Sequence, residues 1–107
     1  MLPKKNRAGT KEVELIFKEG KFIVSHNLTF RYSKSNNKEV KISFIAPKSV
    51  AKLAVRRNLL RRRGYSALEK QIKLFPDGIL GVFVFNKYQD DVSTIENEIK
   101  NILNKIN

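Results

Sequence analysis

The sequence predicts an α+β fold, a small two-layer sandwich in which helices cover a mainly antiparallel sheet. Segments with a helical spacing of apolar residues lie near both ends of the chain and in its middle, and segments of strand character separate them. Their order is α-β-β-β-α-β-α. With 107 residues the chain can bury one core but not two, so we expect a single domain over residues 1–107.

The first element is expected to be a short helix behind a flexible arm. Residues 1–10 (MLPKKNRAGT) are basic and are interrupted by proline and glycine, and Thr10 is a suitable N-cap. A helix from Lys11 to Glu19 then follows, which Gly20 can end. Its apolar residues recur at i, i+3 and i+4: Val13, Ile16 and Phe17.

Strands are expected next. Residues 28–32 (LTFRY) and 40–44 (VKISF) alternate between apolar and polar side chains, as half-buried strands do. The stretch SKSNNK between them has turn chemistry, so we expect a hairpin of two antiparallel strands. Residues 22–24 (FIV) can add a short strand before it.

A long basic helix is expected in the middle of the chain. Pro47 disfavours helical geometry at Ala46, and Ser49 offers a cap for a helix that continues to about Ile72. Gly64 is a weak point within it.

The last third predicts a turn, a strand and an amphipathic helix. FPDG at 75–78 is a turn, and ILGVFVF at 79–85 is an apolar run of strand length. Ser93 and Glu96 form a capping-box pattern at the start of the final helix. Five apolar residues of that helix recur at intervals of three and four, enough to cover one face of a sheet: Ile95, Ile99, Ile102, Leu103 and Ile106.

The charge indicates a polyanionic partner. Lysine and arginine number 22 against 10 acids, a net charge of +12, which favours nucleic acid or an anionic membrane surface. Residues 1–73 carry 19 basic and 5 acidic side chains (+14), whereas residues 74–107 carry 3 and 5 (−2). There is no cysteine, no apolar run of membrane-spanning length and no signal-peptide pattern, so we expect a cytoplasmic protein without a membrane partner.

The strongest basic feature is the stretch AVRRNLLRRRGY at 54–65. At about 100° per residue, five side chains share an arc of roughly 140° on one side of a helix. On the same count an apolar arc lies beside it, and Arg56 and Arg63 flank that arc with stems that can lie along it. The five are Arg57, Arg61, Tyr65, Asn58 and Arg62, and the apolar arc contains Leu53, Leu60, Gly64 and Ala67.

Two interpretations of this basic face are open. A run of charge is commonly a solvated helix surface, but such surfaces interleave glutamate with lysine, and here no acid occurs between Glu39 and Glu69. Arginine donates two parallel hydrogen bonds to a phosphate and stays charged. Tyr65 can stack on an unpaired base. Arginines together with such an aromatic residue suit structured or single-stranded RNA better than a DNA duplex, so we expect no DNA partner.

The same stretch resembles the signature of the bacterial ribonuclease P protein family, A-V-x-R-N followed by paired basic residues. Here it reads Ala54-Val55-Arg56-Arg57-Asn58-Leu59-Leu60-Arg61-Arg62. The other segments follow the family's order over nearly the whole chain. They are VELIFKEGK before the first strands, KISFIAPKSVAK before the helix, the GILGVFVF strand and the amphipathic last helix.

The resemblance implies a left-handed β-α-β crossover through the arginine helix, an exception to the usual right-handed rule. It also implies that the catalyst is an RNA subunit, which binds Mg²⁺ and cleaves precursor tRNA to remove the 5′ leader. The protein then has no catalytic residue of its own. It binds the catalytic RNA through the arginine helix and holds the single-stranded leader between the first helix and the sheet.

Carried over by position, the resemblance assigns two sets of residues. Those expected to meet the catalytic RNA are Arg56, Arg57, Asn58, Arg61, Arg62, Arg63 and Tyr65. Those expected at the leader are Phe17, the arm residues Asn6 and Arg7, and the sheet positions Phe30, Arg31 and Tyr32, of which one aromatic should face the leader. The chain departs from the pattern at Val13, Leu59 and Tyr65, where the family commonly has an aromatic and two arginines.

Two other functions compete with this one. A ribosomal protein would also be small, basic and free of cysteine. A free-standing metal-dependent nuclease would need acid/base or metal-binding groups, but the chain has a single histidine, His26, and only loosely grouped acids. Asp90 and Asp91 are expected to cap the last helix rather than bind a cation.

Overall fold

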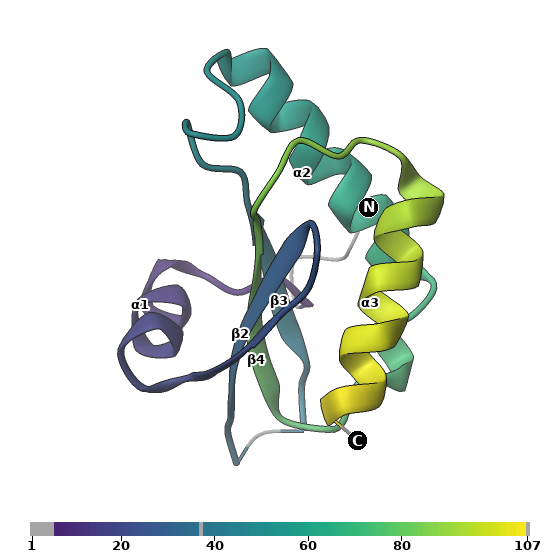
Figure 1. The fold of residues 1–107 in the computed structure, drawn as a ribbon. Coiled ribbons are helices and arrows are strands. Elements are labelled where there is room, and N and C mark those ends of the chain that lie inside the picture. Colours follow the sequence, from purple (N-terminus) through teal and green to yellow (C-terminus); the bar gives the residue numbers. More distant parts are fainter. Residues whose placement is uncertain (1–5, 37, 107) are drawn as a thin grey trace.

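The computed structural model describes residues 6–36 and 38–106, which form three helices and one four-stranded sheet (Figure 1). Within the described residues the elements are α1 (Thr10–Glu19), β1 (Lys21–Val24), β2 (Leu28–Lys34), β3 (Lys41–Ile45), α2 (Ala54–Glu69), a short 3-10 helix η2 (Ile72–Leu74), β4 (Ile79–Phe85) and α3 (Val92–Ile106). This order confirms the predicted α+β class and the sequence of elements.

The strand order is β1-β2-β4-β3, with β1–β2 and β2–β4 antiparallel and β3–β4 parallel. The predicted hairpin between the strands at 28–32 and 40–44 is therefore wrong, because β4 lies between β2 and β3. Strand β4 is the most continuously apolar strand, and a strand buried on both faces belongs in the centre of a sheet. The parallel neighbours β3 and β4 are joined through α2, which is the crossover helix that the resemblance implies.

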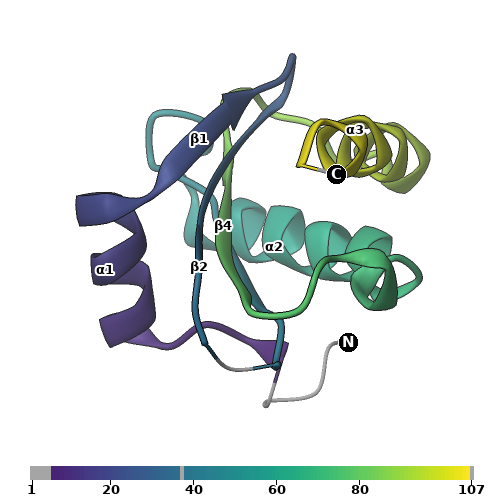
Figure 2. The same ribbon diagram turned by 90° about the horizontal axis from the view of Figure 1, so that it is seen from below.

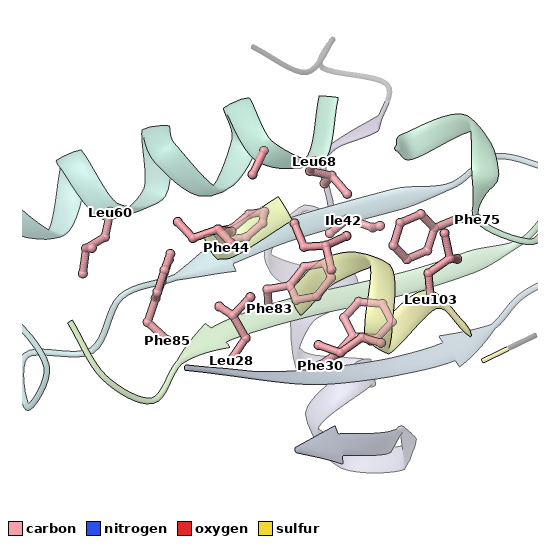
Figure 3. Packing of buried hydrophobic residues seen from close by; sticks show 14 of the residues in the cluster. Leu28, Phe30, Ile42, Phe44, Leu60, Leu68, Phe75, Phe83, Phe85 and Leu103 are labelled. Atoms are coloured by element: carbon pink, nitrogen blue, oxygen red, sulfur yellow. The ribbon is translucent and has the colours of Figure 1, made fainter. Parts of the chain in front are cut away.

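The helices lie on both faces of the sheet (Figures 1 and 2). Helices α2 and α3 pack side by side on one face, and α1 lies on the other face. The prediction of only two layers is therefore wrong, because helices cover both faces of the sheet. The core between the sheet and α2–α3 is built on stacked rings (Figure 3). The Phe83 ring lies 4.3 Å from that of Phe30 and 5.0 Å from that of Phe44, centroid to centroid.

Helix α3 buries the face that its periodicity predicts: Ile95, Ile99, Ile102 and Leu103 are buried and Ile106 is partly buried. It begins at Val92, so the predicted capping box of Ser93 and Glu96 is wrong. Asp91 caps the helix instead, as expected for an acid at this place. The Thr94 hydroxyl donates to Oδ2 of Asp91 at 2.6 Å, and this bond, with backbone N–H groups of Thr94 and Ser93, lowers the pKa of Asp91.

A buried carboxylate ties the β1–β2 turn to α3. Oε1 of Glu98 accepts hydrogen bonds from the Ser25 hydroxyl (2.7 Å) and the Asn27 backbone N–H (2.8 Å). Oε2 of Glu98 accepts one from Nδ2 of Asn27 (2.6 Å). Both Glu98 and Asn27 are buried, so this turn is fixed to the helix by a satisfied polar cluster.

Helix α2 is shorter than predicted. Residues 47–50 form a turn in which the Val50 N–H donates to the Pro47 carbonyl, and Leu53, in an extended conformation, is the N-cap residue. Gly64 is not a weak point. It is buried, and a Cβ there would overlap the Phe44 ring, so the glycine lets the helix approach β3 closely.

Gly64→Ala is expected to lower the free energy of unfolding by about 1–3 kcal/mol, because the added methyl group overpacks the contact with Phe44. Alanine's better helix propensity offsets about 1 kcal/mol of this. Urea unfolding measures the change, and Ser66→Ala, on the exposed side of the same helix, is the control without loss. Phe44→Leu in the Gly64→Ala background should cost less than the two single changes added together; strict additivity would contradict the contact.

Candidate RNA interfaces

The first candidate interface is the outer side of α2. The helix buries Leu60, Gly64, Ala67 and Leu68, which is the packing side that the apolar arc predicts apart from one member. Leu53 is 63% exposed, so its place in that arc is wrong. The exposed side carries most of the predicted RNA-binding residues: Arg56, Asn58, Arg61, Arg62 and Arg63.

Two arginines of this surface are oriented by hydrogen bonds to neutral groups. Arg61 donates to Oδ1 of Asn58, a neutral amide that orients the guanidinium without neutralising it. Arg56 donates to the Tyr88 hydroxyl at 3.2 Å, and that hydroxyl donates to Asp90 at 3.4 Å. The contact with Tyr88, and to a lesser degree the charge of Asp90, raises the pKa of Arg56 above its ordinary value. Arg56 is thereby also tied to the loop before α3.

Two shallow grooves open on this side of α2. One, of about 420 Å³, is lined by Val55, Asn58, Arg61, Arg62 and Tyr65. The other, of about 230 Å³, is lined by Leu59, Arg62, Arg63 and Ser66. Arg62 lines both, so each groove combines an apolar wall with guanidinium donors. Such a surface can accept phosphate oxygens and unstacked bases.

Two residues of the predicted RNA-facing arc form hydrogen bonds with the protein itself. Arg57 donates from Nη1 to the carbonyls of Ala51 (3.1 Å) and Lys52 (2.7 Å), which fixes the chain before α2. The Tyr65 hydroxyl accepts the Phe44 N–H at 3.3 Å, and the Tyr65 ring packs edge-on against Phe44. Both residues border the packing side of the helix. They support the interface, and Tyr65 also forms one wall of the larger groove.

The basic arm is partly docked. Residues 1–5 lie outside the described residues, whereas Asn6 donates from Nδ2 to the Val40 carbonyl (2.9 Å) and the Ser43 hydroxyl donates to the Ala8 carbonyl (2.7 Å). The Arg7 guanidinium lies 5.6 Å from the centre of the Tyr65 ring. The predicted N-cap Thr10 is instead the first helical residue, and Gly9 is the N-cap. Asn6 and Arg7 therefore lie beside β3 and α2, and the structure does not bring them to Phe17.

The second candidate interface lies on the α1 face of the sheet. The Arg31 guanidinium is 4.9 Å from the centre of the Phe17 ring and 5.8 Å from that of Phe22. Phe17 is 41% exposed and Phe22 is 62% exposed. The structure thus brings together two of the predicted leader residues, Phe17 and Arg31. It adds Phe22, which the sequence did not single out.

The other two sheet positions point away from this face. Phe30 is completely buried in the core, so the structure corrects its prediction as a leader contact. Tyr32 stacks on Phe30 at 5.4 Å, partly buried against the α3 side. It lines a groove of about 410 Å³ at the end of the sheet, together with Glu19, Lys21, Ser33, Lys34 and Ile106. Alternation along β2 separates Arg31 from both aromatic neighbours.

The two remaining sequence features are the acidic groups and the single histidine. Across residues 6–36 and 38–106, no three histidine, aspartate or glutamate side chains gather closely enough to hold a metal ion. His26 is exposed in the bend between β1 and β2. No helix in the described part of the chain has the length and apolarity to cross a membrane.

The fold is a basic α+β domain, and the two surfaces have the arginine and aromatic side chains that are typical of RNA-binding proteins. The model of the Ribonuclease P family matches residues 2–107, and the chain therefore belongs to the ribonuclease P protein family. Membership implies a part in the RNA-catalysed complex that processes the 5′ end of tRNA, and the partners that go with the family are the RNase P RNA and precursor tRNA.

Solved structures share the fold. The RNase P protein from Thermotoga maritima is 22% identical, with a TM-score of 0.82 over 94% of this chain and 97% of that one. A Staphylococcus aureus RNase P protein mutant with defective mRNA degradation activity is 13% identical, with a TM-score of 0.83 over 96% of this chain and 89% of that one. No curated protein sequence matches the chain. The family match supports neither the ribosomal protein nor the free-standing nuclease.

Proposed function

We propose that the outer side of α2 is the surface that binds the catalytic RNA, and that the RNA carries out the cleavage. The observation that carries this proposal is the set of exposed arginines on α2, of which Arg61 is oriented by a neutral amide. Arg56, Arg61, Arg62 and Arg63 contact phosphates, and Asn58 positions Arg61. Arg57 and Tyr65 hold the helix and its preceding loop in place.

The leader of precursor tRNA is bound on the opposite face of the sheet, where Phe17 and Arg31 lie in contact. An aromatic ring beside a guanidinium suits an unpaired base and its phosphate, and it does not suit a duplex, in which the faces of the bases are stacked. The leader roles of Asn6, Arg7 and Tyr32 stay predictions. Because the family match supports an RNA-catalysed reaction, we assign Mg²⁺ mainly to the RNA.

Reconstitution tests the division of labour. The purified protein alone is expected to leave precursor tRNA uncut, and addition of the cognate RNA with Mg²⁺ is expected to restore cleavage at the 5′ end of the mature tRNA. An unrelated protein of equal charge, added to the same RNA, controls for nonspecific neutralisation of phosphates. Cleavage by the protein in the absence of RNA would contradict the proposal.

A further inference from the structure

We infer that the edge strand β1 carries a second stacking position for single-stranded RNA, in which Phe22 and Arg31 hold one unpaired nucleotide of the leader. The inference rests on the proposed binding of the leader at Phe17. It extends the proposed leader-binding surface from α1 onto the outer strand of the sheet.

The arrangement of three side chains carries the inference. Phe22 pairs with Arg31 across β1 and β2, so both side chains lie on the α1 face. The Arg31 guanidinium lies 5.8 Å from the centre of the Phe22 ring and 4.9 Å from the centre of the Phe17 ring. One cation is thus shared by two rings that come from different elements, and it is held where a phosphate between two stacked bases needs a donor.

The fold does not require an aromatic residue at position 22. The neighbouring Ile23 points to the opposite face and packs against the core, which anchors the strand. Phe22 remains 62% exposed, and Val24, two residues further on the same face, is 59% exposed. A single exposed apolar residue is common on protein surfaces, but here two successive outward positions of an edge strand are apolar and adjoin an arginine.

The chemistry selects an unpaired nucleotide as the occupant. A base offers a flat apolar face to Phe22, and its phosphate offers two oxygens to the planar fork of Arg31. A paired base keeps its faces inside the helix stack, so a duplex cannot use the ring. The net charge of +12 further favours RNA over an uncharged apolar partner.

The test uses the reconstituted holoenzyme and precursor tRNAs in which successive leader nucleotides are replaced by the fluorescent base 2-aminopurine. In the wild type, fluorescence should be quenched at two leader positions, one for each ring. Phe22→Ala should abolish quenching at one of them and weaken binding of leader-bearing tRNA about tenfold. Phe22→Tyr should restore both effects, and binding of leaderless tRNA should not change.

Leu74→Ala is the matched control, because Leu74 is 61% exposed and lies in η2, outside β1 and α1. It should bind both tRNAs as the wild type does. The inference would be overturned if Phe22→Ala left quenching and affinity unchanged, or if it weakened binding of leaderless tRNA equally. It would also be overturned if Phe22→Ala lowered the melting temperature enough to explain the weaker binding by unfolding. Phe17→Ala distinguishes failure of this inference from failure of the proposed leader site. If it weakens leader binding while Phe22→Ala does not, only this inference fails. If the wild type binds leader-bearing and leaderless tRNA equally, the proposed leader site fails as well.

Discussion

Replacing Arg61 and Arg62 together by alanine is expected to weaken binding of the catalytic RNA by about a hundredfold at low salt. A charge-assisted hydrogen bond contributes about 1.5 kcal/mol, close to a factor of ten in the dissociation constant, and the double variant removes two of them. Both side chains are exposed on α2, so folding should be unaffected. Fluorescence anisotropy with the labelled RNA measures the change.

The salt dependence separates binding to phosphate from other causes. Each phosphate that the protein no longer neutralises should reduce the slope of log affinity against log salt by about 0.7–0.9, so the slope of the double variant should fall by about 1.5 in total. Lys100→Ala with Lys105→Ala removes the same charge from exposed positions of α3 and should leave the slope unchanged apart from a small nonspecific term. Equal reductions in the two double variants would show that only net charge matters and that α2 is not the interface.

Glu98→Ala is expected to lower the free energy of unfolding by about 3 kcal/mol. The change leaves the buried Asn27 N–H, Nδ2 of Asn27 and the Ser25 hydroxyl without their acceptor, and each unsatisfied buried donor costs about 1 kcal/mol or more. Glu98→Gln should be less destabilising, because an amide keeps one acceptor oxygen but presents an NH₂ group to another donor. Urea unfolding followed by circular dichroism measures both.

Glu96→Ala is the matched control on the same helix. Its carboxylate lies 3.9 Å from Nζ of Lys70, whose side chain is 80% exposed, so this ion pair contributes little. The control should change stability by no more than about 0.5 kcal/mol. Similar destabilisation at Glu96 and Glu98 would mean that the buried hydrogen bonds do not hold the β1–β2 turn.

Much of the fold could be predicted because its signals are local. The periodicities at 95–106 and 79–85 predict α3 and β4 within about a turn, since apolar spacing directly reflects which side of an element is buried. The pairing of the strands could not be predicted in the same way. The turn residues SKSNNK fit a tight hairpin and also a longer connection between strands that are not neighbours. The residues of β2 and β3 do not indicate that β4, which follows α2 in the sequence, lies between them.

The candidate site was also predictable where the signal is local and not predictable where it depends on tertiary structure. Helical angles place Asn58, Arg61 and Arg62 on an open surface, but the same angles fail at Leu53, because the chain is not yet helical there. Alternation shows that Arg31 faces opposite to Phe30, yet it cannot tell which face α1 covers. Phe22 could not be found from the sequence because three apolar residues in a row, 22–24, carry no alternation from which to read a face.

The parallel pairing of β3 with β4 has a kinetic consequence. Because the central strand is made late, β2 and β3 have no shared neighbour until residues 79–85 have been synthesised, and the long loops that this pairing closes make for slow folding. During synthesis the arginine-rich segment therefore leaves the ribosome before the sheet that will support it. For that interval the nascent chain is a polycation without a finished fold, so its arginines attract polyanions before the helix surface that arranges them is complete.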